Sequence, residues 1–395
     1  MTRCSKIWLV AASLLIANSG LAFSQEGGKQ PLRLVQTIPL PNVKGRLDHM
    51  DVDVKGKRLF VAGLENGTFE VVDLSAGKWV RSIPGFKKAQ GALFVPGLNK
   101  LFLASGDDGM LRVFRGDTLE LLDSIHLEPG PNRVVYEPKS KLVYVGYGGK
   151  DAGKDYGEIG IIDAQNDKVV GDTKVVAHPS ELLLDKAGKT LFVFVSIADK
   201  LQVIDTNKRE ILSTWGVTSH RPGDAAFDES TSRLFLGTRT PAEMVVMDSK
   251  SGKEVAHLPT PEGMDGVYFD AGRKRVYVSG GRDLPVGFVY VYQQKDADHY
   301  ETIDKIPTRG GAGTSFWSLE LNRYYVAAPA NDSKSVENRN CLGMPALLVG
   351  FVNTGIGRTL TDSATKSSFR CILKFFTLAQ SAEVGPEASP DGIEW

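Results

Sequence analysis

The stretch Arg58-Leu-Phe-Val61 joins a basic residue to an apolar, an aromatic and an apolar residue, and similar stretches recur along the chain. They begin at Arg58, Lys100, Lys141, Thr190, Arg233, Arg275 and Arg323, at intervals of 42, 41, 49, 43, 42 and 48 residues. The second residue after each start is aromatic in six copies, and Val143 is the exception. Seven copies with a period of about 40 to 50 residues are typical of the blades of a β-propeller.

Each copy is accompanied by three more strand-like stretches. In the second copy these are Gly91-Ala-Leu-Phe-Val95 before the motif, and Leu111-Arg-Val-Phe114 and Leu121-Leu-Asp-Ser-Ile125 after it. A four-stranded sheet of this kind has two apolar faces, and stacking such sheets around a ring buries both. The repeat therefore predicts an all-β fold, a seven-bladed β-propeller of four-stranded blades. The 42 glycines and 19 prolines agree with many short strands joined by turns.

The two ends of the repeat region predict how the ring closes. Leu34-Val-Gln-Thr-Ile38 resembles the last strand of a blade, yet it precedes the first blade. We expect this N-terminal strand to complete blade seven, because pairing the chain ends leaves no loose edge in the ring. The propeller is assigned to residues 25–330. A long loop and a candidate closing strand, Ala346-Leu-Leu-Val-Gly-Phe-Val352, occupy residues 331–353.

Residues 354–395 have no repeat signal. We expect an atypical, poorly ordered tail that packs little against the ring. It is either a genuine extension or the product of a shifted reading frame, and its lack of repeat phase favours the second. Cys341 and Cys371 could pair in an oxidising compartment, and the sequence leaves this open.

The N-terminus has the pattern of a targeting segment. Arg3 and Lys6 precede an apolar run from Ile7 to Ala17, and Ala22-Phe-Ser24 offers small residues for cleavage. We expect residues 1–24 to be a signal peptide, which predicts export to the periplasm or the cell exterior. The alternative is a membrane anchor, but the run is shorter than the roughly 18 residues that a spanning helix needs.

Composition narrows the classes of function. The chain has 395 residues, 42% hydrophobic and 24% charged, which excludes a disordered chain because the apolar content suffices for a core. Lys and Arg together number 47, as do Asp and Glu, so the formal net charge is zero. A neutral chain has no bulk attraction for nucleic acid or anionic lipid, and we expect no nucleic-acid partner. We also expect no membrane span once the signal peptide is removed.

These residues resemble the YncE-like, YVTN-repeat β-propeller family. The likeness rests on the repeated Leu-Phe-Val and Val-Tyr-Val strands, on the segment from Asp296 to Tyr300, and on strands that end in Asp. It covers about residues 32–330, and the tail departs from it. The resemblance implies a secreted, WD-repeat-like seven-bladed propeller and implies no reaction.

The strand-ending residues Asp73, Asp163, Asp205 and Asp248 invite a metal-site interpretation. A turn is the favoured interpretation, because an Asp that precedes a turn caps its own backbone and a following Gly takes positive φ. Gly77 and Gly252 stand at the required places. The long spacing also puts these Asp residues on different blades.

The mouth of the central channel is the candidate functional site. The inner strand of each blade starts there, and the residues nine positions before each motif are His49, Gly91, Asn132, Glu181, Asp224, Gly266 and Thr314. Asp265 stands one position earlier, and Arg46, His178 and Arg221 lie further out in a basic collar with Lys87, Lys88, His220 and Arg309. We expect these side chains to ring one mouth and the Glu181 carboxylate to face the channel. Either they bind a small ligand or they line a hydrated channel.

Metal binding and catalysis have weaker support. Oxygen ligands from Glu181, Asp224 and Asn132 suit Ca²⁺ or Mg²⁺, and gluconolactonase-type propellers carry a similar Glu, Asn and Asp set on six blades. No cofactor is expected otherwise. The sequence contains no Gly-x-Ser-x-Gly, His-Glu-x-x-His or Cys-x-x-Cys-His motif.

Three functions remain open. The favoured one is an exported, monomeric, non-catalytic propeller that binds a small molecule or a partner at the channel mouth. The second is a metal-dependent hydrolase of the lactonase type that uses the mouth residues. The third is a structural scaffold for protein interactions.

Overall fold

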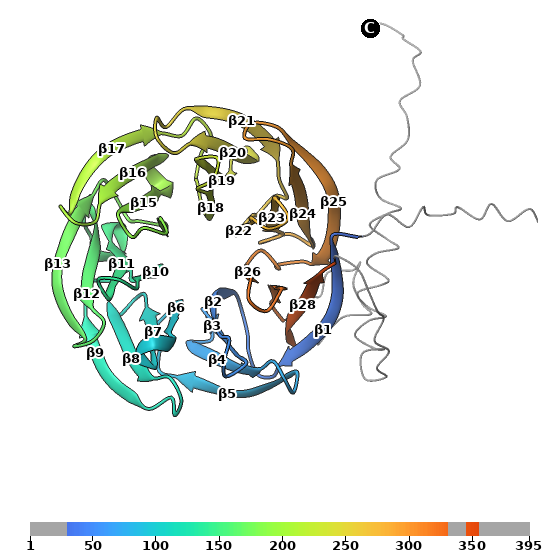
Figure 1. Ribbon diagram of the computed structural model, residues 1–395. Coiled ribbons are helices and arrows are strands. Elements are labelled where there is room, and N and C mark those ends of the chain that lie inside the picture. Colours follow the sequence, from blue (N-terminus) through green and yellow to red (C-terminus); the bar gives the residue numbers. More distant parts are fainter. Residues whose placement is uncertain (1–29, 331–344, 355–395) are drawn as a thin grey trace, which may run out of the picture.

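The computed structural model describes residues 30–330 and 345–354, which form seven antiparallel four-stranded sheets arranged in a ring (Figure 1). The expected seven-bladed β-propeller is confirmed. The predicted signal peptide, most of the 331–353 loop, the tail and both cysteines of the possible pair lie outside the described residues.

Each blade is built from consecutive strands that run from the channel outward. Blade one comprises β2 (Leu47–Asp53), β3 (Arg58–Gly63), β4 (Thr68–Asp73) and β5 (Lys78–Pro84). Blade two comprises β6 (Ala89–Val95), β7 (Lys100–Ser105), β8 (Met110–Arg115) and β9 (Leu121–His126). Blade three comprises β10 (Val134–Glu137), β11 (Leu142–Gly148), β12 (Gly157–Asp163) and β13 (Lys168–Val175).

The next three blades repeat this order. Blade four comprises β14 (Glu181–Leu184), β15 (Thr190–Val195), β16 (Lys200–Asp205) and β17 (Glu210–Gly216). Blade five comprises β18 (Ala225–Asp228), β19 (Arg233–Arg239), β20 (Ala242–Asp248) and β21 (Glu254–Pro259). Blade six comprises β22 (Gly266–Asp270), β23 (Arg275–Gly280), β24 (Val286–Gln294) and β25 (Tyr300–Arg309). The short 3-10 helices η1 (Pro96–Leu98), η2 (Gly149–Ala152) and η3 (Ser196–Ala198) lie in connections.

Blade seven closes the ring as the sequence predicts. It contains β26 (Ser315–Ser318), β27 (Arg323–Ala328) and β28 (Ala346–Asn353), and its outer strand is β1 (Leu32–Leu40) from the start of the chain. β1 pairs with β28 along its length, from Leu32 opposite Asn353 to Leu40 opposite Ala346. The first and last described strands therefore share one sheet, at the right of Figure 1.

The predicted start of the motif in blade three was wrong by one residue. The start residue of the motif pairs with the residue five positions before it on the neighbouring strand, as Arg58 pairs with Asp53. In blade three this relation holds for Leu142 opposite Glu137, and not for Lys141. Lys141 instead has a φ of 59° in the turn before the strand, like Lys57 with 54°. Tyr144 therefore takes the aromatic position, and the exception at Val143 disappears.

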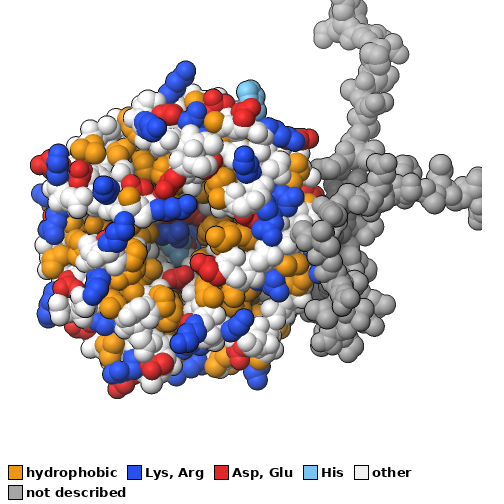
Figure 2. Space-filling view, viewed as in Figure 1, with side chains coloured by type: hydrophobic (Ala, Val, Ile, Leu, Met, Phe, Trp, Pro, Cys, Tyr) orange, Lys and Arg blue, Asp and Glu red, His pale blue; other side chains and the backbone are white. Residues whose placement is uncertain are grey.

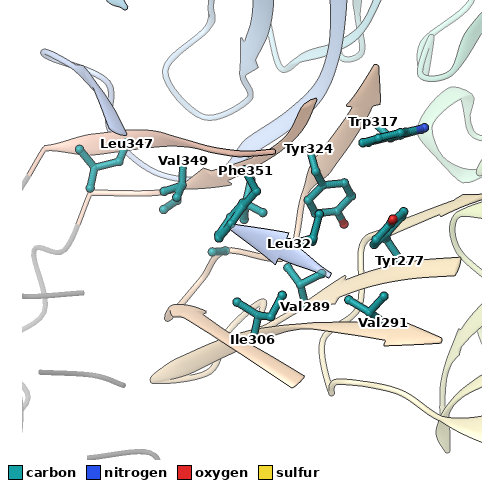
Figure 3. Packing of buried hydrophobic residues seen from close by; sticks show 13 residues of the cluster. Leu32, Tyr277, Val289, Val291, Ile306, Trp317, Tyr324, Leu347, Val349 and Phe351 are labelled. Carbon is teal, nitrogen blue, oxygen red and sulfur yellow. The ribbon is translucent and has the colours of Figure 1, made fainter. Parts of the chain in front are cut away.

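The aromatic position of the motif fills the spaces between blades. Its seven residues are Phe60, Phe102, Tyr144, Phe192, Phe235, Tyr277 and Tyr325, and all are buried. Figure 3 shows the cluster between blades six and seven, where the Tyr277 ring lies 5.6 Å from Trp317 and 5.4 Å from Tyr324. Buried aromatic rings contribute both area and specific ring contacts, so each blade is stabilised by its neighbours.

The basic start residues of the motif link successive blades. Arg58 donates to Asp53 in its own blade and to the Gly116 carbonyl in the next. Lys100 forms an ion pair of 2.7 Å with Asp167, in the turn between the two outer strands of the next blade. The same position that starts a strand thus also fixes the turn of a neighbouring sheet.

The outer strand of every blade contains a β-bulge at the same place. In blade four, Val203 lies opposite Ser213 and Ile204 opposite Ile211, so Leu212 is the extra residue. The equivalent residues are Val35, Val80, Leu122, Val170, Leu212, Val255 and Ile303. Bulges interrupt the row of free backbone groups on an edge strand, which protects the outer edges against pairing with other chains.

The Asp residues at the ends of the third strands form turns, as expected. The Asp73 carboxylate accepts hydrogen bonds from the backbone amides of Ser75 and Ala76, and Asp248 accepts equivalent bonds from Lys250 and Ser251. Gly77 and Gly252 have φ angles of 64° and 73°.

Candidate binding site at the channel mouth

The start of each inner strand lies at the mouth of the central opening, beside the end of the second strand. With blade three in its correct frame, the equivalent residues are His49, Gly91, Arg133, Glu181, Asp224, Gly266 and Thr314. Arg133, not Asn132, belongs to this set, since its carbonyl accepts from the Gly146 amide just as that of Asp224 accepts from Gly237. Figure 2 shows the opening as a hollow lined by basic, acidic and histidine side chains.

Arg133 is the centre of a network that joins three other blades. Its Nε lies 2.8 Å from Oε1 of Glu181, and its Nη1 lies 2.9 Å from Nδ1 of His49. Burial by itself would lower the pKa of Arg133, but the negative charges of Glu181 and Asp224 outweigh burial and raise it. Arg133 is thus a permanent cation held among carboxylates.

The Glu181 carboxylate is not exposed to the channel, contrary to our expectation. The side chain is completely buried in the contact with Arg133. Burial raises the pKa of Glu181, Arg133 acts against this, and the Asp224 carboxyl adds to the rise. Oε2 of Glu181 is buried and has no hydrogen-bond partner among the described residues.

His49 connects Asn132 to this network. The Arg133 guanidinium can only donate, so Nδ1 of His49 is the accepting nitrogen. Nε2 then carries the proton and donates to Oδ1 of Asn132, 3.2 Å away. Asn132 therefore joins the cluster although its strand position differs from the predicted one. The network runs across blades one, three, four and five.

Two glycines clear the space that these contacts need. A Cβ atom at Gly91 would lie 2.0 Å from the carbonyl oxygen of Asn132, and one at Gly266 would lie 2.2 Å from Oγ of Ser315. Contacts this short are sterically forbidden, so a larger residue at either position would force the inner strands apart. At this strand position, blades two and six therefore contribute close backbone approach instead of a side chain.

A second cluster lies nearer the rim, around Asp265. Nη2 of Arg239 lies 2.7 Å from Oδ1 of Asp265, and Nη1 of Arg282 lies 3.7 Å from the same oxygen. Thr314 is buried, and its hydroxyl donates to the Leu47 carbonyl and approaches Asp265 at 3.4 Å. Arg46 pairs with Asp48 at 3.1 Å, and Asp265 also contributes to raising the pKa of Arg46 against the effect of burial.

Sequence reasoning missed Arg133, Arg239 and Arg282. Arg133 was missed because of the one-residue frame error in blade three. Arg239 ends β19 and Arg282 follows β23, and our search covered only the loops that lead into inner strands. In an antiparallel hairpin the second strand ends where the first begins, so its last residues reach the same mouth. That rule applied to the sequence would have found both arginines.

Several predicted collar residues are bound to the loops themselves. Nδ1 of His178 lies 3.0 Å from the Gly148 carbonyl, and the Arg221 amide donates to Asp199, which also pairs with His220. Arg309 donates to carbonyls at the edge of blade seven, including that of Ala328. Of the collar, Arg46 is joined to the charged groups of the mouth.

The proposed metal ligands lie beside a fixed cation. In residues 30–330 and 345–354, no three His, Cys, Asp or Glu side chains gather as a metal-binding group. Arg133 already contacts the Glu181 carboxylate, and a divalent cation placed there would be repelled by the guanidinium. This geometry is unfavourable to the lactonase-type interpretation.

Comparison with known proteins finds a distant relative. No family model matches the chain. Antigen Lp49 of Leptospira interrogans serogroup Icterohaemorrhagiae serovar copenhageni (strain Fiocruz L1-130) is 22% identical over 239 residues, which are 57% of this chain and 51% of the relative. The chain thus spans about half the length of this curated relative. Among the described residues, no helix has the length and apolar character to cross a membrane.

Proposed function

We propose that this protein is an exported, monomeric β-propeller that binds a small molecule at the channel mouth. The observation that carries the proposal is the convergence of different charged and polar side chains from several blades on one opening. His49, Arg133, Asp224 and Asp265 come from four separate blades. Arg133 contacts His49 and Glu181, the charge of Asp224 acts on Arg133, and Asp265 is paired with Arg239. A concave opening with a few fixed polar groups is the usual form of a small-ligand site.

The alternative role as a structural scaffold explains this arrangement less well. Scaffolding would need a stable ring, which the aromatic cores and bulged outer strands already supply. Buried charges at the mouth cost desolvation free energy, and a pair of this kind is weak evidence for a purely stabilising role. A role in ligand binding accounts for charges that are partly open to the channel, such as Arg133, whose side chain is 23% exposed.

Export and family membership belong to the same proposal. The N-terminal targeting pattern and the YncE-like repeat both favour a secreted protein, and the distant relative is named an antigen, a term that suits a protein exposed outside the cell. Fractionation of cells that express the full chain, compared with a variant lacking residues 1–24, tests export. Retention of both forms in the cytoplasm would contradict it.

A thermal-shift screen of the full chain against small metabolites, divalent metals and sugar lactones tests the binding role. A ligand that binds only the folded state raises the melting temperature with concentration. The shift should shrink in the mouth variant Asp224→Asn and persist in Asp123→Asn, a control on outer strand β9. Hits that shift both variants equally would place binding elsewhere and contradict the proposal.

A further inference from the structure

We infer that the channel mouth takes the anionic group of its ligand, a carboxylate or phosphate-type oxyanion, between Arg46, Arg239 and Arg282. This inference rests on the proposed function and names the chemical class that the site selects. Arg46 precedes β2 in blade one, Arg239 ends β19 in blade five, and Arg282 follows β23 in blade six. The ring therefore brings together three guanidinium groups that are far apart in the sequence.

The three arginines have fewer close carboxylate partners than positive charges. Arg239 takes the close contact with Asp265 at 2.7 Å, and Arg46 takes Asp48 at 3.1 Å. Arg282 reaches Asp265 only at 3.7 Å and the highly exposed Asp283 at 3.9 Å. Glu65 also acts on Arg46 through its charge. At the centre of the cluster, three cations thus face two close carboxylates, and Arg282 is the least neutralised.

The electrostatic state of Arg282 supports this count. Burial lowers the pKa of Arg282, and the neighbouring charges of Arg46 and Arg239 lower it further, against the opposite effect of Asp265. An anion placed among the three groups would remove this repulsion. The cluster is therefore arranged to gain free energy when a further negative charge arrives.

The cluster also contains a hydrogen-bond donor without an acceptor among the described residues. Nε of Arg46 is buried and has no hydrogen-bond partner among the described residues. The three side chains are 27%, 22% and 29% exposed, so each is largely desolvated yet still reaches the opening. Guanidinium groups bind carboxylate and phosphate oxygens through paired N–H donors, and such charge-assisted hydrogen bonds are stronger in a partly buried site. A cationic ligand would be repelled by the three arginines, and a neutral ligand would leave their positive charge unbalanced.

The test titrates the full chain with inorganic phosphate and, separately, with succinate, against chloride at the same ionic strength. Isothermal calorimetry should detect binding of at least one of the two oxyanions, and the stronger one identifies the class. Arg282→Gln should weaken binding by about tenfold or more, because one charge-assisted contact is lost. Arg115→Gln removes the same charge from the end of β8, away from the mouth, and should leave binding unchanged.

A second variant acts in the opposite direction. Asp265→Asn removes the carboxylate that competes for Arg239 and Arg282, so it should strengthen oxyanion binding several-fold. Equal affinity in the parent, Arg282→Gln and Asp265→Asn proteins would overturn the inference, as would the lack of any oxyanion binding. If a neutral or cationic hit from the thermal-shift screen depends on Asp224 while oxyanions do not bind, the anion assignment fails and the mouth remains a binding site.

Discussion

At the outer edge of the ring every blade carries the same bulge with an apolar residue, whereas at the inner edge the equivalent position differs from blade to blade. Leu212 and Val80 occupy matching outer positions and do the same work of protecting an edge. Arg133 and Glu181 occupy matching inner positions and carry opposite charges. The outer edge meets the same solvent in every blade, so one solution serves all seven. The inner edge brings the blades together, so unlike residues there can form one site.

The largest expected difference between inner and outer positions comes from removing Glu181. Glu181→Ala leaves the half-buried Arg133 without its closest carboxylate, and loss of one partner from a largely buried ion pair costs about 3 kcal/mol of unfolding free energy. The matched outer change is Glu210→Ala on β17, where the side chain is exposed and the cost should stay within about 0.5 kcal/mol. Urea denaturation of both variants measures the difference. Similar small losses would show that the inner pair contributes little to stability.

A second test compares two glycines. Gly91→Ala should destabilise the protein by about 1 to 3 kcal/mol, because the new Cβ would overlap the Asn132 carbonyl oxygen. Gly97→Ala, in η1, places its Cβ where no atom beyond the adjacent residues lies within 4 Å, and it serves as the control. Denaturation curves that coincide for the two variants would contradict the close approach of the inner strands.

Asp51, an inner residue on β2, should make the stability of the protein depend on pH. Burial raises the pKa of Asp51 to about 6, although the backbone amides of Phe94 and Val52 and the charge of Arg133 act to lower it. A folded-state pKa above the unfolded value means that the folded state holds the proton more tightly. The contribution of Asp51 to stability should therefore fall as pH rises from about 4 to about 6, by about 2 kcal/mol.

The measurement is the difference in unfolding free energy between the parent and Asp51→Asn proteins at pH 4, 5, 6 and 7. Other titrating groups are common to both proteins and largely cancel. The parent should lose stability relative to the variant up to pH 6 and change little above pH 7. A difference that stays constant with pH would mean that Asp51 titrates normally.

The smallest expected effect lies at the outer bulge. Leu212 is 56% exposed, and Leu212→Lys should change the unfolding free energy by no more than about 0.5 kcal/mol. A charged residue at this place also discourages pairing of outer strands. A large loss of stability measured by denaturation would show that the bulge residue packs against something beyond its own sheet.

Much of the fold could be predicted because the repeat is a local pattern. The motif that begins at Arg58 predicts a strand from alternation, and its recurrence predicts blades. The frame failed in blade three, where Lys141 has the basic character of a start residue but belongs to the turn. Strand pairing decides such a frame, and a shift of one residue changes which side chain faces which neighbour.

The candidate site was predictable only in outline. Counting along the inner strands placed His49, Glu181 and Asp224 at one mouth, since equivalent positions in a ring lie at one level. It gave no sign that Glu181 is buried against Arg133, or that Arg239 and Arg282 meet at Asp265. Partner choice among these groups depends on distances between separate blades.

The amino-acid sequence contains the period, the number of blades and the closing strand, because alternation and turn residues act over a few neighbours. The contacts between charged groups at the mouth depend instead on the tertiary structure. Arg133 and His49 are 84 positions apart and meet because the ring closes. The burial of Glu181 against Arg133 and the incomplete neutralisation of Arg282 both arise from that closure, since each depends on which charges the assembled blades bring within a few ångströms.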